Sequence, residues 1–420
     1  MAQRGPKLFY GFYIVGACFV TLFMLWGMVI NTFPIFLKPI SVEMGWGRQE
    51  VPLALMMGAI GMIVAAPIAG RLIDRIGARP VMTVGALIVG LGLLTGSRVT
   101  QLWQICTIFA FIGCGLICST VVPCSLVISN WFVARRGTFM GIAFMGTSIG
   151  GMVASYLSNW IILNYGWRVA FLFSGLSILV IVTPVTLLVI RTRPSQIGLE
   201  PYRDSNSSGE VAENLWGVGV KEAFTLPVFW QITAVMFIVG VVTSGIGNHN
   251  VAYLTDLGHS PTAAAVAWMT VMGVMVLGKL AFGPLADRWG AKNAMAAACV
   301  IYSAGIVILF FAQPYSVAII FAIIYGFASG APLTINPLLT ATNLGMKNFG
   351  VLYGILNIMG TIGGAIGPIV AGAVFEHKRT YIPVFIVFVA LMLLAGVVAW
   401  SINTRPHQFA EQVETADSKA

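Results

Sequence analysis

Charged residues are scarce in this sequence of 420 residues. Asp, Glu, Lys and Arg together make up 9% of it, whereas 58% of the residues are hydrophobic and the mean hydropathy is +0.91. Soluble globular domains carry about 25% charged residues. The shortage of charge therefore excludes an ordinary soluble domain, because so apolar a surface would aggregate in water.

The sequence also lacks the motifs of metal, redox and nucleotide chemistry. Its six cysteines all lie inside apolar runs, where a thiol packs as a small hydrophobic group. Cys114 and Cys118 would share a helix face, but no His or acidic residue stands nearby to complete a metal site. Gly90 and Gly92 lie within an apolar run and not at a strand-to-helix turn that could hold phosphates. We expect no cofactor, no metal, no disulfide, no enzymatic activity and no transport driven by ATP.

Long apolar runs, in contrast, are abundant. Each has roughly 20 residues or more, enough to cross a hydrocarbon core of about 30 Å as an α-helix. The runs predict helices over residues 11–36, 51–72, 80–97, 103–130, 138–163, 168–190, 226–254, 262–286, 292–311, 315–341, 350–375 and 380–402. The first run is too long for a signal peptide and lacks a small-residue cleavage pattern, so we expect it to be retained. We predict an all-α membrane protein with about 12 transmembrane helices in two six-helix bundles.

One long polar stretch, residues 191–225, separates the sixth run from the seventh. It contains a Ser- and Asn-rich run at 205–209, a composition typical of flexible linkers. We expect an N-terminal bundle over 1–190, a cytoplasmic linker over 191–225, and a C-terminal bundle with a short cytoplasmic tail over 226–420.

The basic residues predict the orientation in the membrane. The net charge of +9 does not point to nucleic acid, because Lys and Arg are scattered between the apolar runs. Sixteen of the 23 fall on the side that holds both termini and the linker, six fall on the other side, and one lies within a run. Cytoplasmic loops carry the excess of Lys and Arg. We therefore expect a multi-pass protein of the cell (inner) membrane with both termini cytoplasmic.

The two halves repeat each other. The segment at 70–79 reads GRLIDRIGAR, and the segment at 283–292, which stands 213 positions later, reads GPLADRWGAK with six of ten positions identical. Gly45 and Gly258 are separated by the same spacing, which we call the repeat offset. Parallel six-helix repeats are one architecture of secondary transporters.

The pattern Gly-x-x-x-Asp-Arg-x-Gly-x-Arg at 70–79 and its echo resemble the signature loop of the major facilitator superfamily. More narrowly, the chain resembles bacterial relatives of the monocarboxylate transporters and the oxalate:formate antiporters, through residues 10–13, 36–39, 131–137, 166–168, 193–199 and 253–258. It departs from the animal monocarboxylate transporters at Asn31 and Met275, where those proteins carry a functional lysine and an acidic residue. The resemblance implies a transporter fold and a small organic anion as substrate.

Lys279 lies inside an otherwise uncharged run, and its counterpart in the first half is Ala66. A cation at such a position costs at least about 2.5 to 3.5 kcal/mol on insertion scales, so we expect it to face a cavity or a partner. No Asp or Glu lies deep in any predicted helix. An organic anion could supply the missing counter-charge. The alternative is that the long side chain of Lys279 snorkels to the cytoplasmic interface.

Polar residues inside the runs complete the predicted substrate site. Buried amides need a partner or water, and Tyr353, Asn357 and Thr361, spaced by four, would share one helix face. His249 could exchange a proton near neutral pH. All of these could instead join helices or, for the histidine, be merely solvated. The candidate substrate-binding residues are Lys279, Asn31, Asn336, Tyr353, Asn357, Thr361 and His249.

The repeated loop predicts a gate at the cytoplasmic helix ends. A carboxylate there can stabilise the N-terminus of a neighbouring helix and pair with Arg or Lys, and the resemblance implies that this loop latches the two halves in one state. The candidate gating residues are Asp74, Arg75, Arg79, Arg135, Asp287 and Arg288. The alternative is that these charges only orient the chain in the membrane.

Together these patterns predict a secondary active transporter of a small organic anion, most simply a monocarboxylate. It would work by alternating access, as a proton symporter or an anion exchanger, and as a monomer in the lipid bilayer. A second interpretation is a transporter of neutral solutes or drugs with the same fold. A third is a transporter-like carboxylate receptor, which a large additional cytoplasmic domain would favour.

Overall fold

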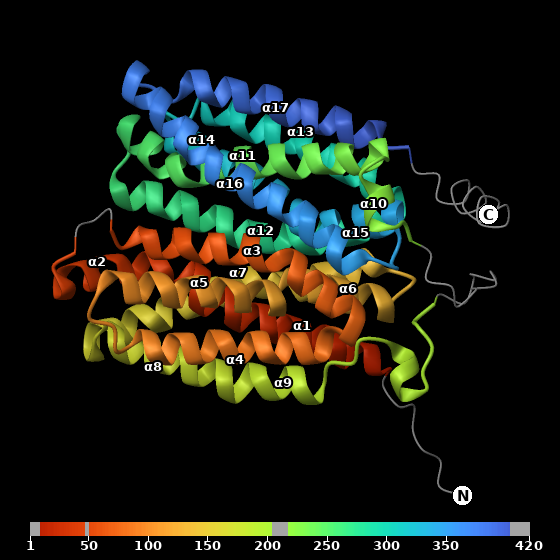
Figure 1. The fold of residues 1–420 in the computed structure, drawn as a ribbon. Coiled ribbons are helices and arrows are strands. Elements are labelled where there is room, and N and C mark those ends of the chain that lie inside the picture. Colours follow the sequence, from red (N-terminus) through yellow and green to blue (C-terminus); the bar gives the residue numbers. More distant parts are fainter. Residues whose placement is uncertain (1–8, 47–49, 204–216, 404–420) are drawn as a thin grey trace, which may run out of the picture. The chain divides into compact units, whose positions relative to one another are not determined.

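The computed structural model describes residues 9–46, 50–203 and 217–403 (Figure 1). The Ser- and Asn-rich run at 205–209 and most of the predicted cytoplasmic tail lie outside the described residues. Contacts divide the chain into two compact units, Met1–Ser208 and Gly209–Ala420. The assignment of 191–225 to a cytoplasmic linker stays a prediction.

The N-terminal unit contains α1 (Tyr10–Leu25), the π-helix η1 (Trp26–Asn31), α2 (Phe33–Met44), α3 (Pro52–Ile76), α4 (Ala78–Gly96), α5 (Leu102–Ser119), α6 (Val121–Trp131), α7 (Arg136–Tyr165), α8 (Trp167–Ser177), the π-helix η2 (Ile178–Val182), α9 (Thr183–Leu188) and the short 3₁₀-helix η3 (Pro194–Ile197). The C-terminal unit contains α10 (Val220–Ala223), α11 (Pro227–Asp256), α12 (Pro261–Trp289), α13 (Ala291–Leu309), α14 (Tyr315–Ser329), α15 (Ala331–Leu344), α16 (Phe349–Lys378) and α17 (Ile382–Ser401).

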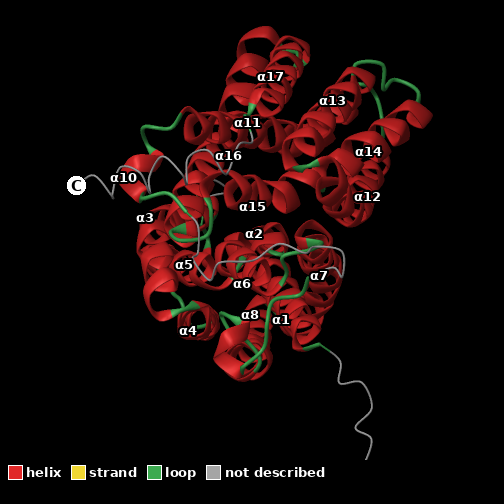
Figure 2. Ribbon diagram, turned by 90° about the vertical axis from the view of Figure 1, so that its right-hand side faces the viewer, coloured by secondary structure: helices red, strands yellow, loops and turns green. Residues whose placement is uncertain are grey.

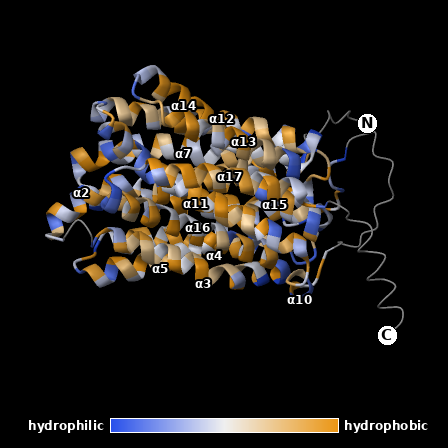
Figure 3. Cartoon of the chain, turned by 90° about the horizontal axis from the view of Figure 1, so that it is seen from above, coloured by the Kyte–Doolittle hydropathy of each residue, from blue (hydrophilic) through white to orange (hydrophobic). Residues whose placement is uncertain are grey.

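Twelve helical stretches of the described chain are long and apolar enough to cross a membrane. Hydrophobic residues occupy the middle of these helices and hydrophilic residues gather near their ends (Figure 3). No strand occurs among the described residues, which contain only isolated β-bridges. The prediction of an all-α membrane protein with about 12 transmembrane helices is confirmed.

Four of the predicted helices are interrupted, which the hydropathy pattern did not indicate. The fourth stretch breaks at Thr120 between α5 and α6, and the tenth breaks at Gly330 between α14 and α15. Pro123 and Pro332 follow these breaks within three residues. Proline has no N–H and its ring clashes with the carbonyl four residues earlier, so it weakens a helix at that point. A helix can nevertheless continue past a proline, as α3 does at Pro67 and α16 at Pro368. The π-helices η1 and η2 precede prolines in the same way.

The internal repeat is also a repeat of geometry. The helices α4 and α13 begin and end at positions related by the repeat offset, and the same is true of α7 and α16. Gly77 (φ 89°) and Gly290 (φ 83°) end the repeated loop in a conformation that only glycine adopts readily. Gly45 and Gly258, the other pair found in the sequence, have φ values of 67° and 96°.

Glycines let one pair of helices approach closely in each unit. A Cβ on Gly27 of η1 would lie 2.6 Å from the carbonyl oxygen of Gly150 on α7, and Gly240 of α11 faces Gly360 of α16 in the same manner. Gly27 and Gly240 are again related by the repeat offset. Small residues at helix crossings are typical of membrane proteins, because van der Waals packing drives association there. Figure 2, which looks along the helices, shows how closely the helices of each unit pack.

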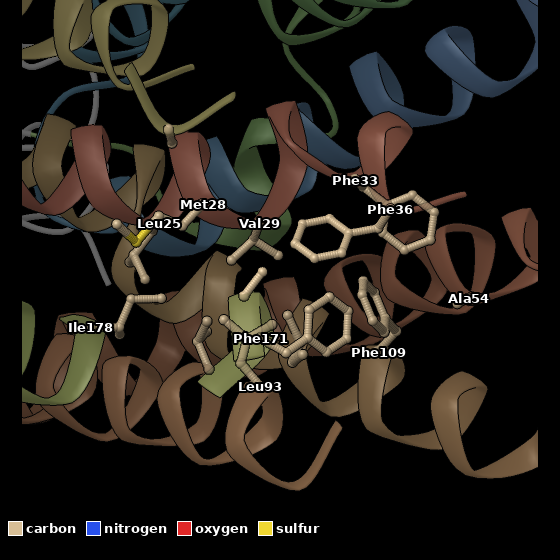
Figure 4. Packing of buried hydrophobic residues seen from close by; sticks show 14 of the residues in the cluster. Leu25, Met28, Val29, Phe33, Phe36, Ala54, Leu93, Phe109, Phe171 and Ile178 are labelled. Atoms are coloured by element: carbon tan, nitrogen blue, oxygen red, sulfur yellow. The ribbon is translucent and has the colours of Figure 1, made fainter. Parts of the chain in front are cut away.

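Aromatic residues fill the core of the N-terminal unit. Phe33 and Phe109 meet edge to face with their ring centroids 5.0 Å apart, and the rings of Phe36 and Phe171 lie 4.7 Å apart (Figure 4). These rings come from α2, α5 and α8. The core therefore holds the last part of the first transmembrane stretch against the fourth and sixth stretches of its own unit.

The ends of the segment between the units are held by main-chain hydrogen bonds. Tyr202 pairs with Phe132 in an isolated β-bridge, and its amide donates to the carbonyl of Trp131 at 2.8 Å. Gly217 pairs with Gly345 in a second bridge. Because Phe132 and Gly345 are related by the repeat offset, the same loop of each repeat holds one end of the segment.

Candidate functional site

Lys279 lies on α12 in the C-terminal unit with only 2% of its surface exposed. Glycines bring α12 close to its neighbours here: a Cβ on Gly278 would overlap the carbonyl of Phe327, and a Cβ on Gly330 would overlap the main chain at Lys279. The helix thus passes directly against the break between α14 and α15. The tight crossing fixes the main chain from which the lysine side chain extends.

Asn336 lies on α15, which packs against α12, α13 and α16. Its side chain is 9% exposed, and its Oδ1 atom accepts no hydrogen bond. A buried polar atom without a partner is rare in native proteins. Asn250 Oδ1 and the Tyr253 hydroxyl on α11 are two further examples in this unit. Asn336 and Lys279 therefore come from two helices that are packed together.

Three further candidates lie along the unbroken helix α16, as the spacing predicted. Tyr353 is 1% exposed and its ring stacks on Phe349, with centroids 5.3 Å apart. Asn357 and Thr361 are half-buried, and the Thr361 hydroxyl donates to the carbonyl of Asn357 at 3.0 Å. Because α16 packs against both α11 and α15, these side chains belong to the same helix group as Asn336.

His249 occupies a different part of the C-terminal unit, towards the end of α11. Its Nε2 atom lies 3.0 Å from the carbonyl oxygen of Pro368 on α16, and its Nδ1 atom lies 3.2 Å from the hydroxyl of Tyr381. The ring is half-buried. Both nitrogens are therefore engaged within the unit.

Asn31 is the one predicted substrate residue that belongs to the N-terminal unit. It ends η1, and its amide nitrogen donates to the carbonyl of Thr147 on α7 at 3.0 Å. A Cβ on Gly151 would touch this amide. Asn31 thus ties the first transmembrane stretch to α7, while the other six candidates lie in the C-terminal unit.

The predicted gating residues lie at the ends of helices in both units. Asp74 is half-buried near the end of α3, whereas Arg75 and Arg135 are exposed. Asp287 and Arg288 are exposed near the end of α12. Their predicted role as a latch stays a prediction.

Arg79 has a contact inside its own unit that the sequence did not indicate. Its Nε atom donates to the carbonyl of Leu187 on α9 at 2.6 Å. Lys292, its counterpart at the repeat offset, donates to the carbonyl of Ile402, just after α17, at 2.9 Å. In both units the cation at this position therefore ties the third transmembrane helix to the end of the sixth.

A second cluster was also missed, and it involves Arg168. Its Nε atom lies 2.9 Å from a carboxylate oxygen of Glu43, and one of its terminal nitrogens donates to the carbonyls of Ser97 and Val99 at 2.8 and 3.0 Å. The indole of Trp167 donates to the other oxygen of Glu43 at 2.6 Å. The Gly-Trp-Arg sequence at 166–168 was the available signal. We call this end of each unit, where α2 and α11 finish, the distal end.

A groove of about 350 Å³ runs between α1 and α7 of the N-terminal unit. Apolar side chains line it, among them Phe12, Phe19, Phe139 and Met145. It contains none of the predicted site residues and offers no polar group to an anion. In the part of the chain that the structure describes, no group of His, Cys, Asp and Glu side chains could hold a metal ion.

Comparison with known proteins adds to this picture. A family model described as Major Facilitator Superfamily matches residues 15–276 and 250–419. Rat monocarboxylate transporter 13 is 24% identical over 411 residues, which cover 96% of this chain and 90% of that protein. The MFS transporter asaE of Aspergillus flavus is 26% identical over 344 residues, covering 80% of this chain and 73% of that protein.

Among solved structures, the fucose:proton symporter FucP of E. coli in its outward conformation superimposes with a TM-score of 0.71. The match covers 92% of this chain and 98% of that one at 17% sequence identity. At this identity the likeness concerns the fold.

Proposed function

The chain belongs to the Major Facilitator Superfamily, and on that premise we propose that it is a secondary active transporter of a small organic anion, most simply a monocarboxylate. It is a multi-pass membrane protein and a transporter, not an enzyme. The proposal adds the class of substrate and the way in which transport is coupled.

The observation that carries the proposal is the burial of Lys279 within a transmembrane helix, with 2% of its surface exposed. A buried ammonium attracts anions and repels cations, and in a medium of low dielectric constant both effects are stronger than in water. A carboxylate would meet it with a charge-assisted hydrogen bond. The resemblance to a relative named monocarboxylate transporter 13 supports the same substrate class.

The polar groups of α15 and α16 would hold the remaining atoms of the substrate. The side-chain amide nitrogens of Asn336 and Asn357 and the hydroxyl of Tyr353 can donate to a carboxylate or a ketone oxygen. The unused Oδ1 atom of Asn336 can accept from a hydroxyl group. A hydroxy acid or a keto acid of a few carbon atoms matches this set of donors and acceptors.

Transport would proceed by alternating access, driven by proton symport or by exchange of one anion for another. We place the protein in the cell (inner) membrane as a monomer, with both termini cytoplasmic and the distal end of each unit facing outwards. Exchange follows if Lys279 keeps its proton throughout the cycle. Proton symport follows if a group of the protein releases its proton after the anion leaves.

Uptake into liposomes tests the proposal. Purified protein would be reconstituted and supplied with radiolabelled formate, acetate, lactate, pyruvate and oxalate, next to neutral sugars and protein-free liposomes as controls. We expect saturable uptake of at least one carboxylate, accelerated by a counter-anion inside for exchange or by an acidic outside for symport. Saturable uptake of neutral solutes with none of the carboxylates would contradict the proposal and favour the neutral-solute interpretation.

A further inference from the structure

The repeat lets the distal ends of the two units be compared position by position. In the N-terminal unit the guanidinium of Arg168 binds the carboxylate of Glu43 and two main-chain carbonyls. Phe36 packs nearby against Phe171 and is 2% exposed. Guanidinium does not lose its proton in proteins, so this end of the first unit holds a permanent cation and an apolar ring.

The C-terminal unit carries different chemistry at the same positions. At the repeat offset, Tyr381 replaces Arg168, Asp256 replaces Glu43 and His249 replaces Phe36. Positive φ supports the offset for two of these pairs. Gly166 and Arg379 (φ 85° and 55°) stand just before Arg168 and Tyr381, and Gly45 and Gly258 (67° and 96°) stand just after Glu43 and Asp256. A titratable ring therefore stands where the first unit has a phenyl ring.

The hydrogen bonds of His249 determine its tautomer. The carbonyl oxygen of Pro368 can only accept, so the Nε2 atom 3.0 Å away must carry a hydrogen. In the neutral ring Nδ1 is then a lone pair, which accepts from the Tyr381 hydroxyl at 3.2 Å. Burial, with a smaller contribution from the Asp256 carboxylate, raises the pKa of Tyr381, so its hydroxyl keeps the proton that it donates.

We propose that His249 is a proton-binding residue at the distal end, and that its protonation on Nδ1 reverses the hydrogen bond with Tyr381 and so links the packing of α11 against α17 to pH. A proton from water adds to Nδ1, the new N–H donates to the hydroxyl oxygen, and the hydroxyl hydrogen must turn to another acceptor. The bond as it stands in the structure is present at high pH. It is lost when Nδ1 takes up a proton.

Several other titratable or charged groups lie on α11 and on the elements packed against it, so the test must single out His249. They are Tyr253 and Asp256 on α11, Lys279, Asp287 and Arg288 on α12, Tyr353, Glu376, His377 and Lys378 on α16, and Arg379 and Tyr381 ahead of α17. Neither α15 nor α17 contains a titratable side chain. Among these groups, the Asp256 carboxylate contributes to the raised pKa of Tyr381.

Nitrogen NMR tests the proton site without any substrate. The protein would be labelled with ¹⁵N-histidine, placed in lipid nanodiscs and titrated between pH 8 and 5, and His249 would be assigned by the signal missing in His249→Gln. We expect the tautomer protonated on Nε2 at pH 8 and conversion to the doubly protonated ring as the pH falls. The opposite tautomer at pH 8, or a ring that stays neutral down to pH 5, would overturn the proposal.

A pH profile of transport tests the link to helix packing, and this readout rests on the proposed function. We expect the initial rate of transport by the wild type to change about two- to tenfold between pH 8 and 5.5. This is the factor by which the loss of one hydrogen bond changes an equilibrium constant. Glutamine can accept from Tyr381 and donate to Pro368 but cannot titrate in this range, so His249→Gln should flatten the profile. Tyr381→Phe should flatten the pH profile too, because it removes the hydroxyl, although the ring of His249 can still bind a proton.

His259→Gln is the matched control, since His259 lies close by in sequence and donates to the carbonyl of Ala312 instead. We expect this variant to keep the profile of the wild type. The link would be refuted if the His249→Gln variant elutes as a monodisperse species and its transport keeps the pH profile of the wild type. If the liposomes take up no carboxylate at all, the proposed function fails while the NMR titration still decides on the proton site.

Discussion

At the scale of single residues, the polar groups inside the helices divide into those that have a hydrogen-bond partner and those that have none. Asn31 donates to a carbonyl of α7, and the hydroxyl of Thr361 donates within its own helix. Asn336, in contrast, has a buried oxygen without a donor, close in the fold to the helix of Lys279. In the proposed function, the substrate contacts lie on α12, α15 and α16.

Removing the charge of Lys279 should weaken substrate binding. A charge-assisted hydrogen bond contributes about 1.5 to 3 kcal/mol, so Lys279→Gln should raise the dissociation constant of the carboxylate roughly 10- to 150-fold. Lys279→Arg should lose less, although a planar guanidinium fits a site shaped for an ammonium poorly. Substrate-induced thermal stabilisation of the purified variants measures the affinity. Equal affinities of wild type and Lys279→Gln would show that this side chain is not the counter-ion.

The Arg168 cluster should stabilise the N-terminal unit mainly through its carbonyl contacts. Exposed ion pairs contribute about 0 to 1 kcal/mol, and the Arg168 and Glu43 side chains are 34% and 49% exposed. Glu43→Gln should therefore lower the thermal midpoint only slightly. Arg168→Ala should lower the thermal midpoint more, because the carbonyls of Ser97 and Val99 lose their donor. The corresponding loss in free energy of unfolding is about 1 to 3 kcal/mol.

Arg98→Ala serves as the control for this comparison. Arg98 is an exposed cation that lies between Ser97 and Val99, whose carbonyls Arg168 contacts, so its removal changes the net charge by the same amount as Arg168→Ala. We expect its thermal midpoint to match that of the wild type. A loss as large as that of Arg168→Ala would mean that the loop depends on charge alone and not on the carbonyl contacts.

At the scale of elements, glycines decide how closely helices pass each other. On α12, Gly278 faces the carbonyl of Phe327, whereas nothing lies within 4 Å of a Cβ added at Gly273. Both residues sit on one helix five positions apart. The difference between them is therefore a difference of packing and not of helix propensity.

Alanine at these two positions should have opposite consequences. Gly278→Ala forces α12 away from α14 and should cost about 1 to 3 kcal/mol, with a loss of transport because the main chain at Lys279 shifts. Gly273→Ala should leave stability unchanged or raise it by up to about 1 kcal/mol, since alanine favours helices. Thermal unfolding in detergent and uptake in liposomes measure both effects. Equal behaviour of the two variants would contradict the packing described for Gly278.

At the scale of the whole molecule, the chain consists of one six-helix plan used twice. The bounds of α4 and α7, the positive φ of Gly45 and Gly77, the close crossing at Gly27 and the cation Arg79 all recur at the repeat offset. The two units are more alike in helix geometry than in the polar residues that they carry. Lys279, Asn336 and His249 have apolar or small counterparts in the first unit, namely Ala66, Pro123 and Phe36.

The predicted latch belongs to this scale, because it concerns the repeated loop of both units. Asp74→Asn and Asp287→Asn each remove a carboxylate whose charge-assisted contact is expected in only one transport state. Both substitutions should therefore change the relative labelling of single cysteines placed near the two membrane faces. Glu376→Gln, which changes an acidic residue at the distal end of α16, is the control and should leave the labelling unchanged. Normal labelling and transport in both Asp variants would refute the latch.

The sequence by itself determined the class of protein, the number of transmembrane stretches and the repeat. Each of these depends on local composition: a run of apolar residues lowers its free energy in lipid whatever its neighbours are, and the glycine loops at 70–79 and 283–292 share most of their residues. Lys279 of α12 could also be identified from local composition, because it lies inside an otherwise uncharged apolar run. The breaks at Thr120 and Gly330 were not predicted, because prolines also lie inside helices that continue, such as Pro67 in α3 and Pro368 in α16.

Only the tertiary structure decided which polar groups meet. Arg168 and Glu43 are 125 residues apart in the sequence, and His249 and Tyr381 are 132 apart. Hydropathy does not reveal such pairs, because every transmembrane helix satisfies its main-chain hydrogen bonds internally and could pack against many others. Shape at the glycine crossings selects the neighbours, and the neighbours then determine that His249 accepts from Tyr381 and that the side-chain oxygen of Asn336 has no donor.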